Sequence, residues 1–278
     1  MDNILRSLSS SQIVVDLGCG TGSFSYRSYD CKVIGIDISL TPASLIRDGV
    51  RIQYLQSNAA EIPLSDNSVD AVICNHTLEH FPYRRVLAEI NRILNPNGLL
   101  WIAVPNGYSF DDALYRFVFA GGGHINRFRF KALIEEVQGH TELSLIQSNL
   151  LFSGFVYFKR PTQEQARIFP MPARALYLMP KSLNRALILS LNSITRIIDK
   201  YCGTRTSLYG WGLVFAKTSI TLDLLPSYFN VCWKCGSGND AGYLRATEKL
   251  SSSFGVTFYR CANCDERNLF FEPLDGMS

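Results

Sequence analysis

The chain has 278 residues, of which 47% are hydrophobic and 18% are charged, and its net charge is +3. This composition predicts a globular protein of one large or two smaller domains with an apolar core. The small net charge does not by itself indicate a nucleic-acid partner. No run approaches the roughly 18 apolar residues of a membrane span, and residues 1–12 are too polar for a secretory signal. We therefore expect a cytoplasmic protein without a transmembrane segment.

A strand followed by a glycine-rich turn is the most informative feature near the N-terminus. The apolar run at residues 13–17 carries Asp16, and Gly18, Gly20 and Gly22 follow at alternate positions. Glycine has no Cβ, so such a turn adopts positive φ and lets a ligand lie against bare backbone. A strand leading into this turn is typical of a nucleotide-type site at the carboxyl end of a parallel sheet. Ser23 replaces the third glycine of a dinucleotide fingerprint, which disfavours an NAD site.

Strand and helix patterns alternate along most of the chain. We expect strands at residues 13–17, 32–37, 51–55, 69–74, 99–104, 143–152 and 212–216. Apolar residues recur at helical spacing over residues 83–94, and a second helix is expected over residues 128–137. Strands that alternate with helices predict an α/β fold, a Rossmann-like, doubly wound sheet of seven strands.

A long insertion, about residues 159–209, separates the last two expected strands. One amphipathic helix is expected from Ser182, because apolar residues recur there every three or four positions and form one face. These residues are Leu183, Leu187, Leu191, Ile194, Ile198 and Tyr201. Nine basic and two acidic residues give the insertion a charge of +7. A helical cap with a solvated basic face is the simpler interpretation, and a substrate lid or a peripheral membrane contact are the alternatives.

Residues 16–22 resemble the first motif of class I S-adenosylmethionine-dependent methyltransferases. Further motifs of this family follow in the same order, at residues 36–39, 58–63, 66–70, 78–80 and 94–98. The likeness covers roughly residues 13–106 and is strongest to the small-molecule branch that includes ubiquinone-type and natural-product enzymes. The resemblance implies an enzyme that binds S-adenosylmethionine and transfers its methyl group.

The resemblance also assigns cofactor-binding roles to residues near the strand ends. Asp37 lies 19 residues after Gly18, where a carboxylate accepts hydrogen bonds from both ribose hydroxyls. Ile38 is expected to pack against the adenine, and Ala59 to offer its backbone N–H to the ring. Asn58 stands where the family usually has Asp, and its carbonyl oxygen can still accept from the adenine amino group.

Two further residues complete this set of cofactor contacts. Asn75, just past the fourth strand, is expected to line the methionine end of the cofactor. Asp16 is expected to orient the turn and the cofactor's ammonium group. The glycines at 18, 20 and 22 bring backbone N–H groups close to the amino-acid portion and the ribose.

The transfer step points to histidine, because oxygen and nitrogen acceptors often need a base. His124 follows a run of three glycines, and His76 and His80 flank Glu79 just beyond the fourth strand. We expect His124 and His76 to act as bases that face the substrate. In ubiquinone-type relatives the positions of His76, Glu79 and His80 carry Glu, Glu and His, which can hold a divalent cation. Metal binding at Glu79 and His80, and simple packing or capping, stay open as alternatives.

Two C-x-x-C pairs near the C-terminus predict a metal site. Cys232 and Cys235 form one pair, Cys261 and Cys264 form the other, and 25 residues lie between them. Four thiolates in two paired turns bind Zn²⁺ tetrahedrally and leave no open position, so the ion is structural. The segment resembles a zinc ribbon. Unrelated dithiol pairs or disulfides are the alternative, which a reducing compartment disfavours.

The expected organisation is a cofactor-binding methyltransferase domain at residues 1–220 and a zinc-ribbon domain at residues 228–278. The acceptor is expected to be a small molecule, anionic or lipid-linked, methylated on oxygen. Residues 231–278 contain five basic and six acidic residues, which disfavours nucleic acid and favours a protein partner or dimerisation. An RNA or protein methyltransferase that uses the ribbon for recognition is one alternative, and a non-catalytic cofactor-binding scaffold is another.

Overall fold

The computed structural model describes residues 1–39, 51–121, 123–152, 155–202, 204–218, 228–235, 237–253 and 255–270. Contacts divide the chain into two compact units. Unit 1 comprises residues 1–105, 124–149 and 211–226, and unit 2 comprises residues 106–123, 150–210 and 227–278. This grouping places the insertion with the C-terminal residues, whereas the sequence suggested a boundary near residue 220. Residues 271–278 of the expected ribbon lie outside the described residues.

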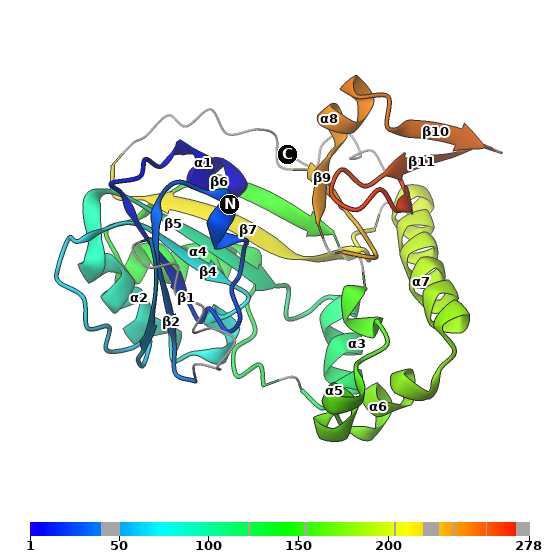
Figure 1. The fold of residues 1–278 in the computed structure, drawn as a ribbon, viewed down its shortest axis with the longest axis horizontal. Coiled ribbons are helices and arrows are strands. Elements are labelled where there is room, and N and C mark those ends of the chain that lie inside the picture. Colours follow the sequence, from blue (N-terminus) through cyan, green and yellow to red (C-terminus); the bar gives the residue numbers. More distant parts are fainter. Residues whose placement is uncertain are drawn as a thin grey trace. The chain divides into compact units, whose positions relative to one another are not determined.

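Seven strands of a nine-stranded sheet form the frame of unit 1 (Figure 1). In spatial order the strands are β3 (Ile52–Gln56), β2 (Lys32–Asp37), β1 (Ile13–Leu17), β4 (Val69–Asn75), β5 (Leu94–Pro105), β7 (Leu208–Ala216) and β6 (Ser144–Phe152). The pairs β1–β2, β1–β4, β2–β3 and β4–β5 are parallel. The order of the strands reverses between β1 and β4. The carboxyl ends of these two strands are therefore the place where an open α/β sheet binds its ligand.

The helices of unit 1 follow the spacing of their apolar residues. They are α1 (Asp2–Ser7), α2 (Tyr83–Ile93) and α4 (Phe130–His140), with short 3₁₀ turns η1 (Tyr26–Ser28) and η3 (Leu78–His80). Val86, Leu87, Ile90 and Ile93 are buried on α2, as the sequence predicts. The structure adds α1, whose Ile4 and Leu5 are buried although the sequence indicated no helix there. Six residues are too few to show a helical period.

Strand β5 begins five residues earlier than expected. Leu94 already pairs with Val69 of β4, and the regular ladder resumes at Leu99 opposite Ala71 after an irregularity in register. The Asn-Pro-Asn-Gly sequence at residues 95–98 directly follows the end of α2 and lies inside this irregular strand. The other expected strands agree with the structure to within a few residues.

Unit 2 contains the insertion and the cysteine pairs. Its helices are α3 (Phe110–Val118), α5 (Gln163–Ile168), α6 (Met171–Leu178), α7 (Lys181–Cys202) and α8 (Ala241–Ala246), with the 3₁₀ turn η4 (Val156–Phe158). The far end of β6 pairs in parallel with β8 (Tyr228–Val231), which pairs with β9 (Gly238–Asp240). Strands β10 (Leu250–Ser253), β11 (Val256–Arg260) and β12 (Arg267–Leu269) form a separate antiparallel sheet. Of these elements the sequence indicated α7 but not α3.

Helix α7 forms where the sequence predicts it, but only part of its apolar face is buried. Leu183, Ile194, Ile198 and Tyr201 of that face are exposed, whereas Leu187 and Leu191 pack against the core of unit 2. The buried positions include Ile188 and the polar residues Asn184, Asn192, Thr195, Arg196 and Asp199. None of the helices among the described residues is long and apolar enough to cross a membrane.

Gly212 of β7 lies against the side chain of Trp101 on β5 in unit 1. A Cβ at this position would lie 2.4 Å from Cη2 of Trp101 on β5. We expect Gly212→Ala to lower the free energy of unfolding by about 1–3 kcal/mol, because the indole has to move within a packed sheet face. Gly139→Ala on α4 is the matched control, since a Cβ there meets nothing within 4 Å. Denaturant unfolding of both variants checks this, and equal stability would contradict the tight contact.

Candidate functional site

The glycine turn after β1 adopts the conformation that its residue types require. Gly18, Gly20 and Gly22 have φ values of 71°, 50° and 110°. Side chains with a Cβ rarely adopt such values, so these three positions need glycine. The backbone N–H groups of Gly18 and Cys19 donate to the carbonyl of Ile36 at 2.7 and 3.0 Å. The turn is thereby fixed against the end of β2.

Asp37 holds this turn from the end of β2. Its Oδ2 accepts a hydrogen bond from the N–H of Gly20 at 2.9 Å, and its Oδ1 accepts from the N–H of Ser39 at 2.9 Å. A carboxylate offers about four acceptor positions, so two remain for a ligand. The carboxylate can therefore shape the turn and still accept hydrogen bonds from hydroxyl groups.

Asp16 anchors the other side of the turn from within the core. Its Oδ2 accepts hydrogen bonds from the Tyr26 hydroxyl at 2.5 Å and from the N–H of Ser23 at 2.9 Å. Its Oδ1 is buried and has no hydrogen-bond partner. Burial raises the pKa of Asp16 above its usual value. The oxygen without a partner suits a hydrogen-bond donor or a positive charge supplied by a ligand. The contact between Tyr26 and this carboxylate could not be predicted from the residue pattern.

The residues expected near the adenine gather at the ends of β2 and β3. Ile38 directly follows β2 and is 67% exposed, so its side chain can contact a ligand. The N–H of Ser57 donates to the carbonyl of Asp37 at 3.0 Å and brings the next segment beside it. In that segment Ala59 is buried, and Oδ1 of Asn58 accepts from the N–H of Ala60 at 3.0 Å. The Asn58 oxygen expected to hold an amino group thus also shapes its own turn.

His76, one of the two histidines expected to act as bases, lies on a segment next to the glycine turn. A Cβ at Gly18 would lie 2.5 Å from Cγ2 of Thr77 and 3.1 Å from the ring of Phe81. The segment between Asn75, which ends β4, and Phe81 therefore packs directly on the turn. His76 begins this segment with a φ of 55°, an uncommon value for a residue other than glycine.

Glu79 is the centre of the histidine cluster, which the sequence alone did not reveal. Its side chain is 1% exposed, and Oε1 lies 3.8 Å from Nδ1 of His76 and 4.0 Å from Nε2 of His124. Its other oxygen, Oε2, is buried without a hydrogen-bond partner. The rings of His80 and His124 meet edge to face, with centroids 4.8 Å apart. Both histidines expected to be bases therefore surround one buried carboxylate.

The loop that carries His124 is fixed by main-chain contacts. The N–H groups of Ile125 and Asn126 both donate to the carbonyl of Glu79 at 3.0 Å. The side-chain amide of Asn126 donates to the carbonyls of Leu78 at 3.2 Å and Phe81 at 2.7 Å. One ligand atom each from Glu79, His80 and His124 lies within 4.8 Å of the others. The imidazole and carboxylate groups of the cluster are able to exchange a proton, and Glu79, His80 and His124 are also able to bind a cation.

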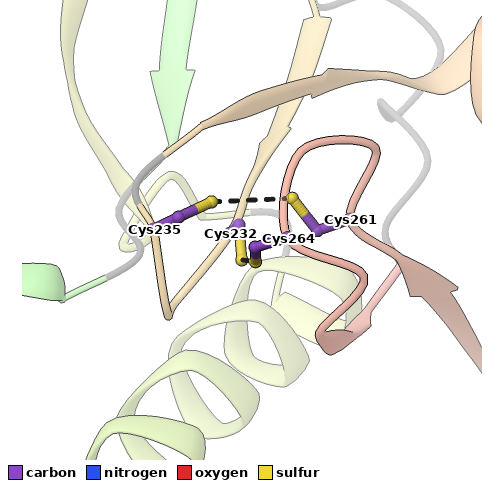
Figure 2. Close-up of side chains that lie close together, drawn as sticks. All are labelled: Cys232, Cys235, Cys261 and Cys264. Atoms are coloured by element: carbon purple, nitrogen blue, oxygen red, sulfur yellow. Dashed lines mark hydrogen bonds between the residues drawn. The ribbon is translucent and has the colours of Figure 1, made fainter.

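The four cysteines of the two C-x-x-C pairs converge in unit 2. Figure 2 shows Cys232 beside Cys264 and Cys235 beside Cys261, with Sγ–Sγ distances of 3.7 and 3.6 Å. A tetrahedral zinc ion with Zn–S bonds of about 2.3 Å requires sulfurs about 3.8 Å apart. All four Sγ atoms lie within 4.8 Å of one another. The arrangement fits a four-thiolate metal site, and no pair among the four is a disulfide.

Backbone and amide donors surround two of these sulfurs. The N–H groups of Lys234 and Asn263 donate to Sγ of Cys232 and Cys261, each at 3.4 Å. The side-chain amides of Asn268 and Asn239 donate to the same two sulfurs at 3.5 and 3.6 Å. Such donors stabilise thiolates and orient metal ligands. Burial raises the pKa of Cys232 to about 12, so metal binding at this sulfur has to displace a proton.

Comparisons with known proteins agree with this geometry. The family model described as a methyltransferase domain matches residues 15–102. A probable S-adenosylmethionine-dependent methyltransferase of Mycobacterium tuberculosis is 34% identical over 102 residues, which are 35% of this chain and 37% of that protein. Mouse tRNA (carboxymethyluridine(34)-5-O)-methyltransferase ALKBH8 is 36% identical over 104 residues, 36% of this chain and 16% of that protein. The chain thus spans well under half the length of these relatives.

A solved structure extends the likeness in fold. The complex between the Haloferax volcanii Trm112 methyltransferase activator and a putative methyltransferase matches with a TM-score of 0.52 and 19% identity. The match covers 78% of this chain and 87% of the other. At this identity the likeness concerns the fold alone. Residues 15–102 are therefore similar to a methyltransferase domain, and the glycine turn and the strand order agree with that likeness.

Proposed function

We propose that this chain is an enzyme that transfers a methyl group from S-adenosylmethionine to a small-molecule acceptor, at an oxygen atom. The observation that carries this proposal is the glycine turn that follows β1, at the point in the sheet where the strand order reverses between β1 and β4. Its three glycines have positive φ, Asp37 holds it from one side, and Asp16 holds it from the other. The orphaned oxygen of Asp16 supports the proposal, because the cofactor offers an ammonium group that would satisfy it.

The residues of unit 1 suit the parts of this cofactor, which brings a methyl group already activated on a sulfonium. Asp37 would accept hydrogen bonds from the ribose hydroxyls, and Ile38 would cover the adenine. Ala59 and Asn58 would contact the edge of the ring, and Asn75 would line the methionine end. The chain's main task is then to place the acceptor in line with the S–CH₃ bond, since positioning can supply roughly 7–11 kcal/mol.

The histidine cluster suits the proton transfer that an oxygen acceptor requires. As the acceptor oxygen bonds to the methyl carbon, the S–C electron pair returns to sulfur and the acceptor loses its proton. His124 or His76 would take that proton, and the buried carboxylate of Glu79 would stabilise the resulting imidazolium. A positioned base contributes about 10²–10⁴-fold in rate.

We further propose that the cysteine cluster holds a structural zinc ion. The sulfur distances and the N–H donors support it, and the core of this module is small. Its buried residues are Cys232, Ala241, Leu244, Tyr259, Cys261 and Phe270. A core of this size gains most of its stability from such a metal. The module would serve as a docking surface for a protein partner or a second copy.

An RNA acceptor is the second candidate, favoured by the likeness to the mouse tRNA methyltransferase. That likeness spans 104 residues, which are 36% of this chain. The near-balanced charge of residues 231–278 gives that module no basic footprint for phosphates. Strong salt-dependent RNA binding by the full chain would favour this candidate over a small molecule. A protein that binds the cofactor and methylates nothing would instead be a scaffold.

Cofactor affinity should depend on the ionisation of Asp16. Because burial raises its pKa, the carboxylate protonates at a higher pH than an ordinary Asp, and affinity should fall as the pH drops through that raised pKa. Asp16→Asn should weaken binding at least tenfold at pH 7.5, the order of a charged hydrogen bond, and flatten the pH dependence. Calorimetric titration from pH 5 to 8 tests this, with the exposed Asp30→Asn as control. A pH profile unchanged by Asp16→Asn would contradict the role.

Turnover should depend on the histidines while cofactor binding does not. We expect His124→Ala or His76→Ala to lower kcat by about 10²–10⁴-fold, because the acceptor loses its base. The Kd for the cofactor should change little. Transfer of labelled methyl to a small-molecule extract measures the first quantity and calorimetry the second. His140→Ala, at the end of α4, is the control; full activity in both cluster variants would exclude histidine as the base.

Zinc content should follow the cysteine cluster. The wild-type chain is expected to carry about one zinc ion, and Cys261→Ser to carry none, because a four-thiolate site loses a ligand that nothing replaces. Elemental analysis by plasma mass spectrometry gives the count. Cys202→Ser, an exposed cysteine of α7 outside the cluster, should keep its metal. Stoichiometric zinc in Cys261→Ser would argue against this site.

A further inference from the structure

The exposed apolar side chains of unit 2 are concentrated on the insertion. Fifteen large apolar side chains are exposed among the described residues, and eight of them lie on α5, α6 and α7. They are Ile168, Met171, Leu178, Leu183, Ile194, Ile197, Ile198 and Tyr201. Isolated exposed apolar residues need no explanation, but a contiguous group marks an interaction surface. We call these eight residues the apolar belt.

The apolar belt follows the helical period. On α7, Ile194, Ile197, Ile198 and Tyr201 are spaced by three and four residues, and Leu183 lies about three turns earlier on the same side. On α6, Met171 and Leu178 are seven residues apart, which places both on one side of that helix. Ile168 ends α5 just before α6 begins and is 81% exposed. Short turns join the three helices, which follow one another along the chain (Figure 1), so the belt residues all come from residues 168–201.

The buried polar residues of α7 explain why part of its apolar face is exposed. Asn184 donates from Nδ2 to the carbonyl of Phe158 at 2.7 Å and accepts from the N–H of Arg160 at 3.1 Å. Asp199 accepts from the backbone N–H groups of Thr206 and Ser207. These polar residues satisfy backbone groups of the neighbouring segments. The helix is therefore fixed with these polar residues inward, and turning it over would leave those backbone groups without partners.

The charge of the insertion narrows the choice of partner. Residues 159–209 carry +7, and Arg167, Arg174 and Lys181 are exposed beside the belt. Two copies of this surface would bring like charges together, which disfavours self-association. Nucleic acid would use aromatic side chains for stacking, and the belt is mainly aliphatic. An anionic bilayer offers negative charge and an apolar interior together.

We propose that α5, α6 and α7 dock unit 2 on the surface of a membrane that contains anionic lipids. The belt residues would enter the boundary between headgroups and acyl chains, and the basic residues would contact lipid phosphates. This mode needs a helix that lies in the interface, which agrees with the finding that α7 does not suit a membrane span. The proposal does not rest on methyl transfer, because binding to vesicles is measured without turnover.

Vesicle co-sedimentation of the full chain tests the proposal. We expect binding to phosphatidylcholine vesicles with 30% phosphatidylglycerol, little binding to phosphatidylcholine alone, and release as NaCl rises from about 0.1 to 0.5 M. Ile194→Ser/Ile197→Ser should weaken binding roughly tenfold or more, since two buried aliphatic side chains are lost. Arg167→Gln/Lys181→Gln should weaken it about fivefold for each charge removed.

Matched controls separate docking from a general loss of structure or charge. Val256→Ser removes an exposed apolar residue of β11, and Arg85→Gln removes an exposed charge of α2, so neither should change vesicle binding. Circular dichroism confirms that each variant is folded. Equal binding to neutral vesicles, or none to anionic ones, would overturn the proposal. So would a concentration-dependent dimer in sedimentation velocity that Ile194→Ser/Ile197→Ser abolishes.

Discussion

The buried carboxylate of Asp16 is the interaction on which the cofactor site depends. It lies next to the last residue of the core strand β1, and its Oδ2 accepts hydrogen bonds from Ser23 and Tyr26, which follow the glycine turn. Burying a carboxylate costs free energy, and these bonds offset part of that cost. The turn is thus closed around an acid that stays incompletely satisfied through Oδ1. A buried polar atom without a hydrogen-bond partner is suited to binding a ligand, because the ligand supplies that partner.

The parts that could be predicted from sequence are those fixed by local chemistry. Positive φ at Gly18, Gly20 and Gly22 follows from residue type, and convergence of the cysteine pairs follows from their spacing. The position of Glu79 could not be predicted, because loops 45 residues apart along the chain bring His124 to it. The side of α7 that is buried could not be predicted for a related reason. Periodicity shows that a helix has an apolar side, but only the backbone groups around Asn184 and Asp199 decide which side is buried.

The two units divide the chemistry between them. All residues expected to contact the cofactor, and all the histidines of the cluster, belong to unit 1. The basic insertion and the cysteine module belong to unit 2, which shares its own apolar core around Phe155, Ile188 and Trp233. Trp233 joins that core from within the first C-x-x-C turn, and Arg185 of α7 pairs with Glu266 near the second. The cysteine module and the helices of the insertion are therefore neighbours within one unit.

The four cysteine sulfurs differ in exposure, and this has a consequence for oxidative damage. Cys232 and Cys261 are buried and each accepts from a backbone N–H and a side-chain amide. Cys235 is exposed and Cys264 is half-buried. Oxidation of thiolates follows their exposure, and donors that disperse charge on sulfur make it a poorer nucleophile. Peroxide should therefore attack Cys235 and Cys264 first, and a metal ion held by the four sulfurs would be exposed to oxidative loss from that side.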